Sequence, residues 1–294
     1  MLIEVTLFNI ISGLILGSVY GLSTMGLNII FGVLKIINVA HGQLMMLGAY
    51  LAFWFFVIFG LIPFITIPPS IIIGIALGFV IFYTTIRRLI EAPEMLTLVA
   101  TFAIGILLEE AAKFVWGPDY RAYSWHAGEM RIFEFLLPFT KVYSALLSIV
   151  LAVFLHIFLQ KTTIGTALRA TIQNPEGALV CGVDVEKIRA LGFAIGISVT
   201  LMGGVLLTLF IPVGINPYMG HEYTLKAFVI AVLGGLGSTW GAFFGGVIFG
   251  IVENSSYQIF SYLGFHSPFS MTFFLAFFLL LLILLVRPRG LFGR

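Results

Sequence analysis

Residues 162–183 read TTIGTALRATIQNPEGALVCGV, a stretch of small and polar residues between two long apolar runs. Residues 167–172 favour a helix, and Asn174-Pro175 ends it because the residue before a proline is pushed out of the helical region. Residues 176–180 restart a second short helix that Gly182 can close. The stretch therefore predicts two short helices between two apolar spans. It is either an ordinary cytoplasmic loop or a surface that a partner contacts.

The composition around this stretch is that of a membrane protein. The chain has 294 residues, of which 60% are hydrophobic and 10% charged, and its mean hydropathy is +1.12. Soluble domains are about one quarter charged. The net charge of +2 and its scattered basic residues give no reason to expect a nucleic-acid partner. The single cysteine, Cys181, excludes an internal disulfide and a cysteine-based metal cage.

Apolar runs near 20 residues long predict membrane spans. Residues 1–6 contain no lysine or arginine, so no cleavable signal is expected and the first run stays as a span. The predicted full spans are residues 7–31, 44–59, 70–86, 95–116, 142–159, 188–213 and 270–286.

The region before the last span is irregular. Residues 225–233 are apolar, the sequence GGLGST interrupts them at 234–239, and residues 241–252 are apolar again. About nine residues cannot cross a bilayer of about 30 Å as a helix. The first run therefore either borrows flanking residues or is a half-helix that breaks inside the protein. The predicted fold class is an all-α polytopic transmembrane helical bundle, one domain over residues 1–294, with about 8–9 spans including this broken pair.

Three features of the first four spans carry further expectations. Gly13, Gly17 and Gly21 form a ladder of small residues that favours close helix packing, so the first span is expected to be central. The polar hinge NVAHGQ at 38–43 is either a plain turn or a break that lines a cavity. Glu109 and Lys113 in the fourth span are spaced for an i,i+4 pair, and an interfacial position is expected for them.

The basic residues predict the orientation. With alternating spans, one side carries Lys35, Arg87, Arg88, Lys161, Arg169, Lys187, Arg189, Arg287, Arg289 and Arg294. The other side carries Arg121, Arg131 and Lys141, diluted by acidic residues in a long aromatic loop. The positive-inside rule places residues 162–183 and the C-terminus in the cytoplasm, and the N-terminus outside.

Several chemistries are not expected. No Gly-Lys pair occurs, so there is no P-loop lysine and the chain should not hydrolyse ATP by itself. The five histidines are far apart in the sequence, so no zinc site is expected. No serine stands in a nucleophile-elbow context. No enzymatic activity is therefore expected of this chain.

Three segments carry a resemblance to a known family: residues 12–50 (SGLILGSVYGLSTMGLNIIFGVLKIINVAHGQLMMLGAY), 162–185 (TTIGTALRATIQNPEGALVCGVDV) and 220–253 (GHEYTLKAFVIAVLGGLGSTWGAFFGGVIFGIVE). In this order they resemble the branched-chain amino-acid ABC transporter permeases of the LivH type. The resemblance implies a multi-pass subunit of the cell (plasma or inner) membrane in a bilayer. It also implies partners: a second LivM-type permease, two ABC ATPase subunits that use ATP and Mg²⁺, and an extracytoplasmic substrate-binding protein. No cofactor is implied in this chain.

Carried onto this sequence, the resemblance assigns residues 162–185 to the coupling segment that an ATPase subunit grips. The coupling residues are Gly165, Arg169, Ala170, Asn174, Ala178 and Gly182. The candidates for the translocation path are Asn28, Asn38, His41, Gly42, Gly234, Gly235, Gly237 and Ser238, although the glycines have an equally simple role in packing.

The implied function is passage of leucine, isoleucine and valine by alternating access, driven by the separate ATPases. Two alternatives stay open. One is a related ABC permease for urea, short amides or another small polar solute. The other is an ATP-independent channel or secondary transporter, which offers no explanation for residues 162–183.

Overall fold

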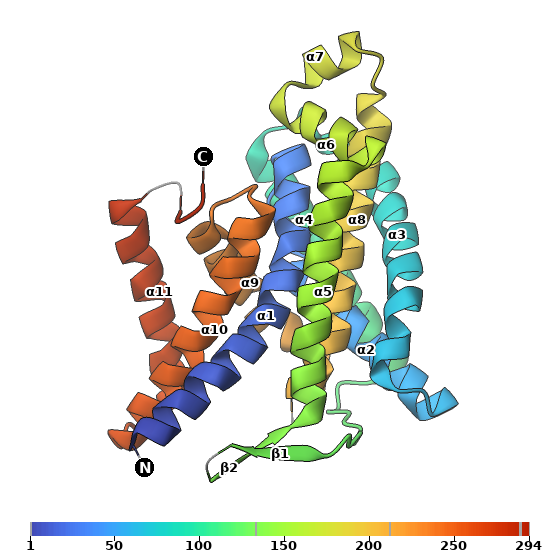
Figure 1. The fold of residues 1–294 in the computed structure, drawn as a ribbon. Helices are drawn as coiled ribbons and strands as arrows, with labels where there is room; N and C mark the ends of the chain where they lie inside the picture. The colour runs from blue at the N-terminus through green and yellow to red at the C-terminus, as the bar shows by residue number, and fades with distance from the viewer. Residues whose placement is uncertain (1, 133, 212, 288–289, 294) are drawn as a thin grey trace.

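The computed structural model describes residues 2–132, 134–211, 213–287 and 290–293. The chain forms a bundle of long helices with a small β-hairpin at one end (Figure 1). The helices are α1 (Leu2–Leu34), α2 (His41–Phe59), α3 (Ile67–Thr84), α4 (Glu94–Trp116), α5 (Phe139–Lys161), α6 (Thr163–Gln173), α7 (Pro175–Val180), α8 (Val185–Leu207), α9 (Met219–Gly234), α10 (Thr239–Tyr262) and α11 (Pro268–Val286).

The membrane spans agree with those predicted. Within the described ranges, seven helices are long and apolar enough to cross a membrane, and α9 with α10 forms a further pair bent by 116°. The seven full spans and the broken pair are therefore confirmed. The apolar run at 225–233 is extended by flanking residues, because α9 begins at Met219, but with 16 residues α9 is one arm of the broken pair and is not among the seven full spans.

The β-hairpin is the feature that the sequence did not predict. Strand β1 (Glu129–Ile132) pairs antiparallel with β2 (Phe135–Pro138) inside the loop between α4 and α5. Strands of four residues are too short to give a recognisable alternation. The same loop also pairs with the segment before α9, because Arg121 and Ile215 exchange backbone hydrogen bonds of 2.9 and 2.8 Å.

The two ends of the bundle differ in charge. Figure 1 places α6, α7 and the C-terminus at one end, and the N-terminus and the hairpin at the other. The basic residues that follow α1, α3 and α5 lie at the α6–α7 end. The positive-inside rule assigns this end to the cytoplasm. Arg289 and Arg294, which also entered the orientation argument, lie outside the described residues.

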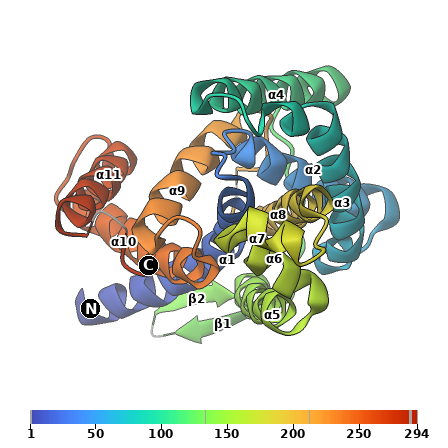
Figure 2. The same ribbon diagram turned by 90° about the horizontal axis from the view of Figure 1, so that it is seen from above.

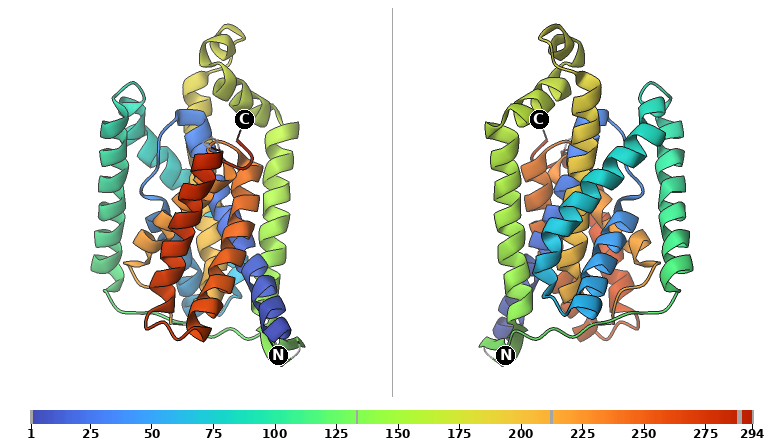
Figure 3. Two further views of the ribbon diagram at one scale, coloured as in Figure 1. Left: turned by 90° about the vertical axis from the view of Figure 1, so that its left-hand side faces the viewer. Right: turned by 90° about the vertical axis from the view of Figure 1, so that its right-hand side faces the viewer.

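Helices α1 and α8 form the centre of the bundle (Figure 2). Helix α1 packs along α10 through its glycine ladder: a Cβ on Gly13 would lie 2.6 Å from the Gly250 carbonyl oxygen, and one on Gly17 2.6 Å from that of Gly246. Since lipid gives no hydrophobic reward for helix association, this close backbone contact supplies the attraction. The prediction of a central first span is confirmed. Helices α4 and α5 stand at opposite edges (Figure 3).

The order of elements repeats along the chain. A long helix (α1 or α8) is followed by a short non-helical segment and by a second helix (α2 or α9), and two further helices follow. Helices α2 and α9 touch at their first turns. Gly42 and Gly220 lie at this contact, and neither position has room for a Cβ atom.

This contact lies deep inside the bundle. His41, the first residue of α2, contacts Ser23 of α1, and Ser23 lies about 16 Å along the helix axis from Leu34 at about 1.5 Å per residue. The starts of α2 and α9 therefore meet well inside the bundle, away from its α6–α7 end.

Candidate functional site

A cavity of about 570 Å³ lies toward the α6–α7 end of the bundle. Residues from four helices and the α9–α10 break line it, among them Asn28, Lys35, His156, Arg169, Gly237 and Ser238. It brings Arg169, predicted for ATPase coupling, together with Asn28, Gly237 and Ser238, predicted for the path. The lining also includes the basic residue Lys35, so this cavity carries positive charge.

Asn28 holds the break between α9 and α10. Its Nδ2 donates to the carbonyl oxygens of Gly235 (3.0 Å) and Ser238 (2.8 Å), and the residue is fully buried in α1. A buried amide that makes two hydrogen bonds to a neighbouring backbone fixes that backbone in place. Asn28 therefore couples the central helix to the broken pair.

The residues of the break have separate local roles. Gly235 and Gly237 have φ angles of 101° and 83°, which L side chains adopt only with strain. Gly234 packs directly against Gly241 of α10, and Ser238 caps α10 by accepting a 3.0 Å hydrogen bond from Gly241 N. The break is thus a tight turn, and α10 begins directly after it with Ser238 as its N-cap.

The hinge residues Asn38, His41 and Gly42 do not line the 570 Å³ cavity. His41 is fully buried, with Nε2 3.1 Å from Ser23 Oγ and Nδ1 3.3 Å from Thr200 Oγ1. Asn38 Oδ1 accepts from Ala40 N (3.2 Å), and Gly42 N donates to Thr224 Oγ1 (2.9 Å). These three residues form the joint where α1, α2, α8 and α9 meet, and their role in the path stays a prediction.

The helices of the 162–183 stretch form as the sequence predicts. Thr162 caps α6 by accepting from Gly165 N (3.0 Å), and Asn174 caps α7 by accepting from Gly177 N (3.0 Å). Gly182 has a φ angle of 81° and follows α7. Asp184 then caps α8 by accepting from Lys187 N (3.1 Å), and the hydrogen bond that it accepts from the Lys187 side chain (2.8 Å) holds the pKa of its carboxyl below the usual value.

The predicted coupling residues differ in accessibility. Gly165 and Ala178 are buried, and Gly165 packs against the end of α5. Arg169 donates from Nη1 to Gln160 Oε1 (2.7 Å), which ties α6 back to α5, while Ala170 is half-buried and Asn174 is exposed. Their role in coupling stays a prediction.

Two residues at the outermost turn of this segment escaped the sequence reasoning. Leu179 is 64% exposed and Val180 is 89% exposed at the end of α7. The sequence does carry a signal for them, since they are the apolar pair just before the Cys181-Gly182 turn that ends the short helix. They form an exposed apolar surface at the end of α7. Helix α7 lies at the extreme end of the bundle (Figure 1).

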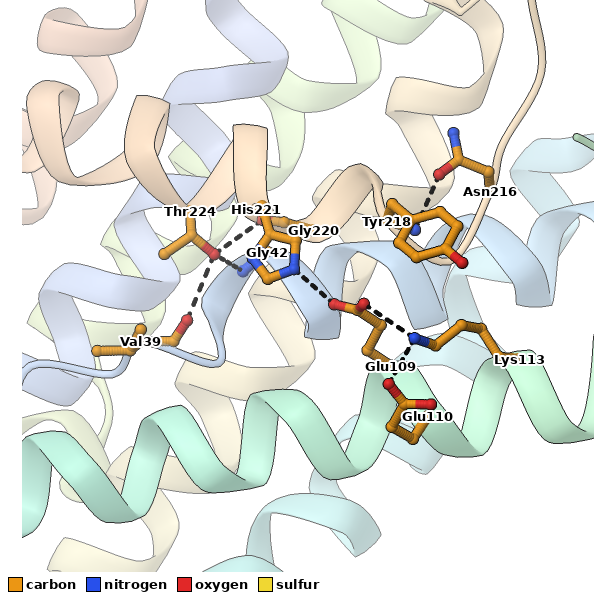
Figure 4. Close-up of polar contacts among 10 residues, drawn as sticks. All are labelled: Val39, Gly42, Glu109, Glu110, Lys113, Asn216, Tyr218, Gly220, His221 and Thr224. Carbon is orange, nitrogen blue, oxygen red and sulfur yellow. Dashed lines mark hydrogen bonds and ion pairs between the residues drawn. The ribbon is translucent and has the colours of Figure 1, made fainter. Parts of the chain in front are cut away.

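A second cavity of about 210 Å³ lies between α2, α4 and α9, next to the contact of Gly42 with Gly220. His221 in the first turn of α9 lines it, and His221 Nε2 lies 2.7 Å from Glu109 Oε2 (Figure 4). Glu109 also lies 3.4 Å from Lys113 Nζ, so the predicted i,i+4 pair is confirmed. The side chain of Glu109 is 9% exposed and contacts α9 through His221, while its interfacial position stays a prediction.

A charged cluster between α1, α9 and α10 was also missed. Lys226 Nζ lies 2.6 Å from Glu222 Oε1 and 2.7 Å from Glu253 Oε1, and it donates to Tyr20 Oη at 3.2 Å. The i,i+4 spacing of Glu222 and Lys226 in an apolar run was the available signal. In the part of the chain that the structure describes, no group of three or more His, Cys, Asp or Glu side chains could hold a metal ion.

Comparison with known proteins gives the family. The family model described as "Branched-chain amino acid transport system / permease component" matches residues 9–286. The chain is 30% identical to the high-affinity branched-chain amino acid transport system permease protein LivH of Escherichia coli (strain K12), over 96% of this chain and 94% of the relative. It is 28% identical to the permease protein BraD of Pseudomonas aeruginosa, over 97% and 95%. It is also 29% identical to the probable permease protein LivM of Methanocaldococcus jannaschii, over 48% and 44%.

No solved structure matches the chain. The matched family is one of transporter subunits without an ATPase domain, and no cofactor is expected in them. The family match, the full-length similarity to LivH and BraD and the seven spans with one broken pair agree with one another. The chain belongs to the branched-chain amino acid ABC transport permease family and is a multi-pass membrane subunit of that kind.

Proposed function

We propose that this chain forms half of the membrane path of an ATP-driven importer for leucine, isoleucine and valine. The observation that carries the proposal is the 570 Å³ cavity, which Arg169 of α6 lines together with Asn28 and Ser238. The segment proposed for ATPase coupling and the residues proposed for the path therefore line one cavity. The names of the relatives, which state branched-chain amino acid transport, support the substrate.

The partners follow from the same reasoning. Two ABC ATPase subunits would hold this chain and a second, LivM-type permease at the α6–α7 end, and an extracytoplasmic binding protein would deliver substrate at the hairpin end. The exposed apolar tip formed by Leu179 and Val180 is the surface of this segment best suited to an ATPase groove. Gly165 and Ala178 are buried and contribute to the packing of the segment, and Arg169 connects it to α5 by a hydrogen bond to Gln160.

In this mechanism the chain performs no chemistry. Closure of the ATPase dimer moves α6 and α7, and the link from Arg169 to Gln160 passes that movement to α5 at the wall of the cavity. The bundle then exchanges an outward-facing state for an inward-facing one, as in alternating access. ATP drives the exchange only to the extent that it binds the two states of the complex with different affinities.

The first experiment is purification of the tagged chain from its native membranes in mild detergent, with identification of the proteins that accompany it. The parent is expected to bring an ATPase pair and a second permease. The double variant Leu179→Asp/Val180→Asp should lose the ATPase but keep the second permease, and Arg169→Glu should weaken ATPase retention. The matched control is Tyr120→Asp, which changes a residue that is 64% exposed in the loop at the opposite end.

Uptake by the purified complex in liposomes decides the substrate. Leucine uptake that needs ATP and the binding protein supports the proposal. A complex that takes up urea or short amides in place of leucine overturns the substrate, and a lone chain that moves solute without ATP overturns the importer.

A further inference from the structure

We infer that the 210 Å³ cavity between α2, α4 and α9 is a substrate subsite inside the helical bundle, which holds the zwitterionic head and the aliphatic side chain of an α-amino acid. The inference rests on the proposed function and names a place for the solute that the 570 Å³ cavity does not supply. Three features of the cavity match the three parts of such a solute.

The first feature is a pair of helix N-termini, which match a carboxylate. Helices α2 and α9 begin beside the cavity, and neither has a side-chain cap. The first turns of both contribute to the lining through Gln43 and His221. Helix N-termini carry a partial positive charge that attracts anions, and discontinuous membrane helices use it for substrate carboxylates. The Gly42 N–H already donates to Thr224 Oγ1, so the attraction here comes from the helix dipoles.

The second feature is an unused acceptor, which matches an ammonium group. Gln43 is 4% exposed and lines the cavity, and its Oε1 has no hydrogen-bond partner. Its side chain runs from α2 past Gly220 toward Gly105, where an added Cβ would lie 3.3 Å from Oε1. A buried acceptor without a donor costs about 1–3 kcal/mol, so a ligand that brings a donor gains that free energy.

Negative charge close to the cavity favours the same group. Glu109 Oε2 lies 2.7 Å from Nε2 of His221, and Glu110 lies on the same helix with its side chain 62% exposed. Lys113 contacts both carboxylates and offsets one of the two charges (Figure 4). The remaining negative charge attracts a cationic group to this side of the cavity.

The third feature is an apolar wall, which matches an aliphatic side chain. Phe102 and Ile106 of α4 and Leu225 and Phe228 of α9 also line the cavity. Phe102, Ile106 and Leu225 are 44–49% exposed, so the cavity opens at the surface of this chain between α4 and α9. A second permease that covers this opening would enclose the solute, which places the subsite on the contact between the two permeases.

The test uses the complete complex in liposomes and two measurements. Gln43→Met removes the unpaired acceptor while it keeps the length of the side chain, and Gly105→Val reduces the cavity. Both should lower leucine uptake roughly 10-fold or more while binding-protein-stimulated ATP hydrolysis continues. The matched control is Leu107→Val, because Leu107 is 67% exposed and does not line the cavity.

The second measurement needs no disruptive change. In a Cys181→Ser background, Ile106→Cys is treated with a small methanethiosulfonate reagent, and saturating leucine should slow its modification. Glu94→Cys, which is exposed at the start of α4 and lines neither cavity, should show no such protection.

The outcomes separate the two proposals. Loss of uptake with retained ATP hydrolysis, together with protection at position 106, supports the subsite. If the parent complex takes up leucine but both variants do as well and leucine protects nothing, the subsite is overturned and the importer stands. If the parent complex takes up no branched-chain amino acid, both fall.

Discussion

Lys226 Nζ lies 2.7 Å from Glu253 Oε1, and this ion pair joins the two arms of the bent α9–α10 unit inside the membrane. The side chain of Lys226 is 5% exposed, and the rings of Tyr20, Tyr223, Phe269 and Phe273 lie 5.1–5.9 Å from its Nζ. The cluster connects α1, α9, α10 and α11.

Removal of Lys226 is expected to destabilise the protein strongly. Lys226→Met leaves Glu253 buried without its cation, and breaking a buried pair from one side costs about 3–5 kcal/mol. Thermal unfolding of the detergent-purified chain, followed by size-exclusion chromatography, should show a clear fall in Tm. The double variant Lys226→Met/Glu253→Gln should recover part of it, because no uncompensated carboxylate remains at position 253.

The matched control for this experiment is Lys187→Met. Lys187 pairs with Asp184 at 2.8 Å, but the two side chains are 74% and 50% exposed. Exposed pairs contribute about 0–1 kcal/mol, so Tm should barely change. Equal losses in both variants would contradict the assignment of a structural role to the buried cluster.

Asn28→Asp is expected to loosen the α9–α10 break. Asparagine donates two hydrogen bonds to Gly235 and Ser238, whereas a carboxylate cannot donate and faces two carbonyl oxygens. The unfolding free energy should fall by about 1–3 kcal/mol, and the transport rate should fall by a larger fraction than the stability does. Asn254→Asp serves as the control, since Asn254 donates only to Gly250 within its own helix (3.1 Å).

Gly17→Ala is expected to separate α1 from α10. The added methyl group would lie 2.6 Å from the Gly246 carbonyl oxygen, and backbone cannot move aside as a flexible side chain can. Expression and monodispersity should fall. Gly32→Ala on the same helix should be tolerated, because its nearest neighbour would lie 3.6 Å away.

Cys181 provides a natural probe of orientation. It is exposed beside the tip of α7. If the α6–α7 end is cytoplasmic, a membrane-impermeant maleimide should label the chain in inside-out vesicles and leave it unlabelled in intact cells. Tyr120→Cys in a Cys181→Ser background should show the reverse pattern. Labelling of Cys181 from outside would reverse the assigned orientation.

The sequence predicted most of the fold because its signals are local. Apolar runs of span length, the Asn174-Pro175 boundary and the glycine ladder at 13, 17 and 21 each depend on neighbouring residues. The start of α9 was left open, since its first turn carries the polar residues His221 and Glu222, which hydropathy does not assign to a span.

The candidate sites depend on distant pairs and were predicted only in part. Asn28 and the break at 234–239 were both chosen, but nothing local indicates that they touch. Glu109 and His221 are 112 positions apart, and Gln43 is of interest only because its acceptor has no partner in the folded chain. Arg169 was chosen as a coupling residue, but nothing local indicates that it contacts Gln160, which directly follows the apolar part of α5.

The two backbone hydrogen bonds between Arg121 and Ile215 have a mechanical consequence. They make the loop outside the membrane continuous with the short segment that enters α9 at Met219. A protein that docks on that loop therefore pulls on a connecting segment of only a few residues, which is too short to absorb the movement. The loop that contains Arg121 and the buried contact at Gly220 then have to move together.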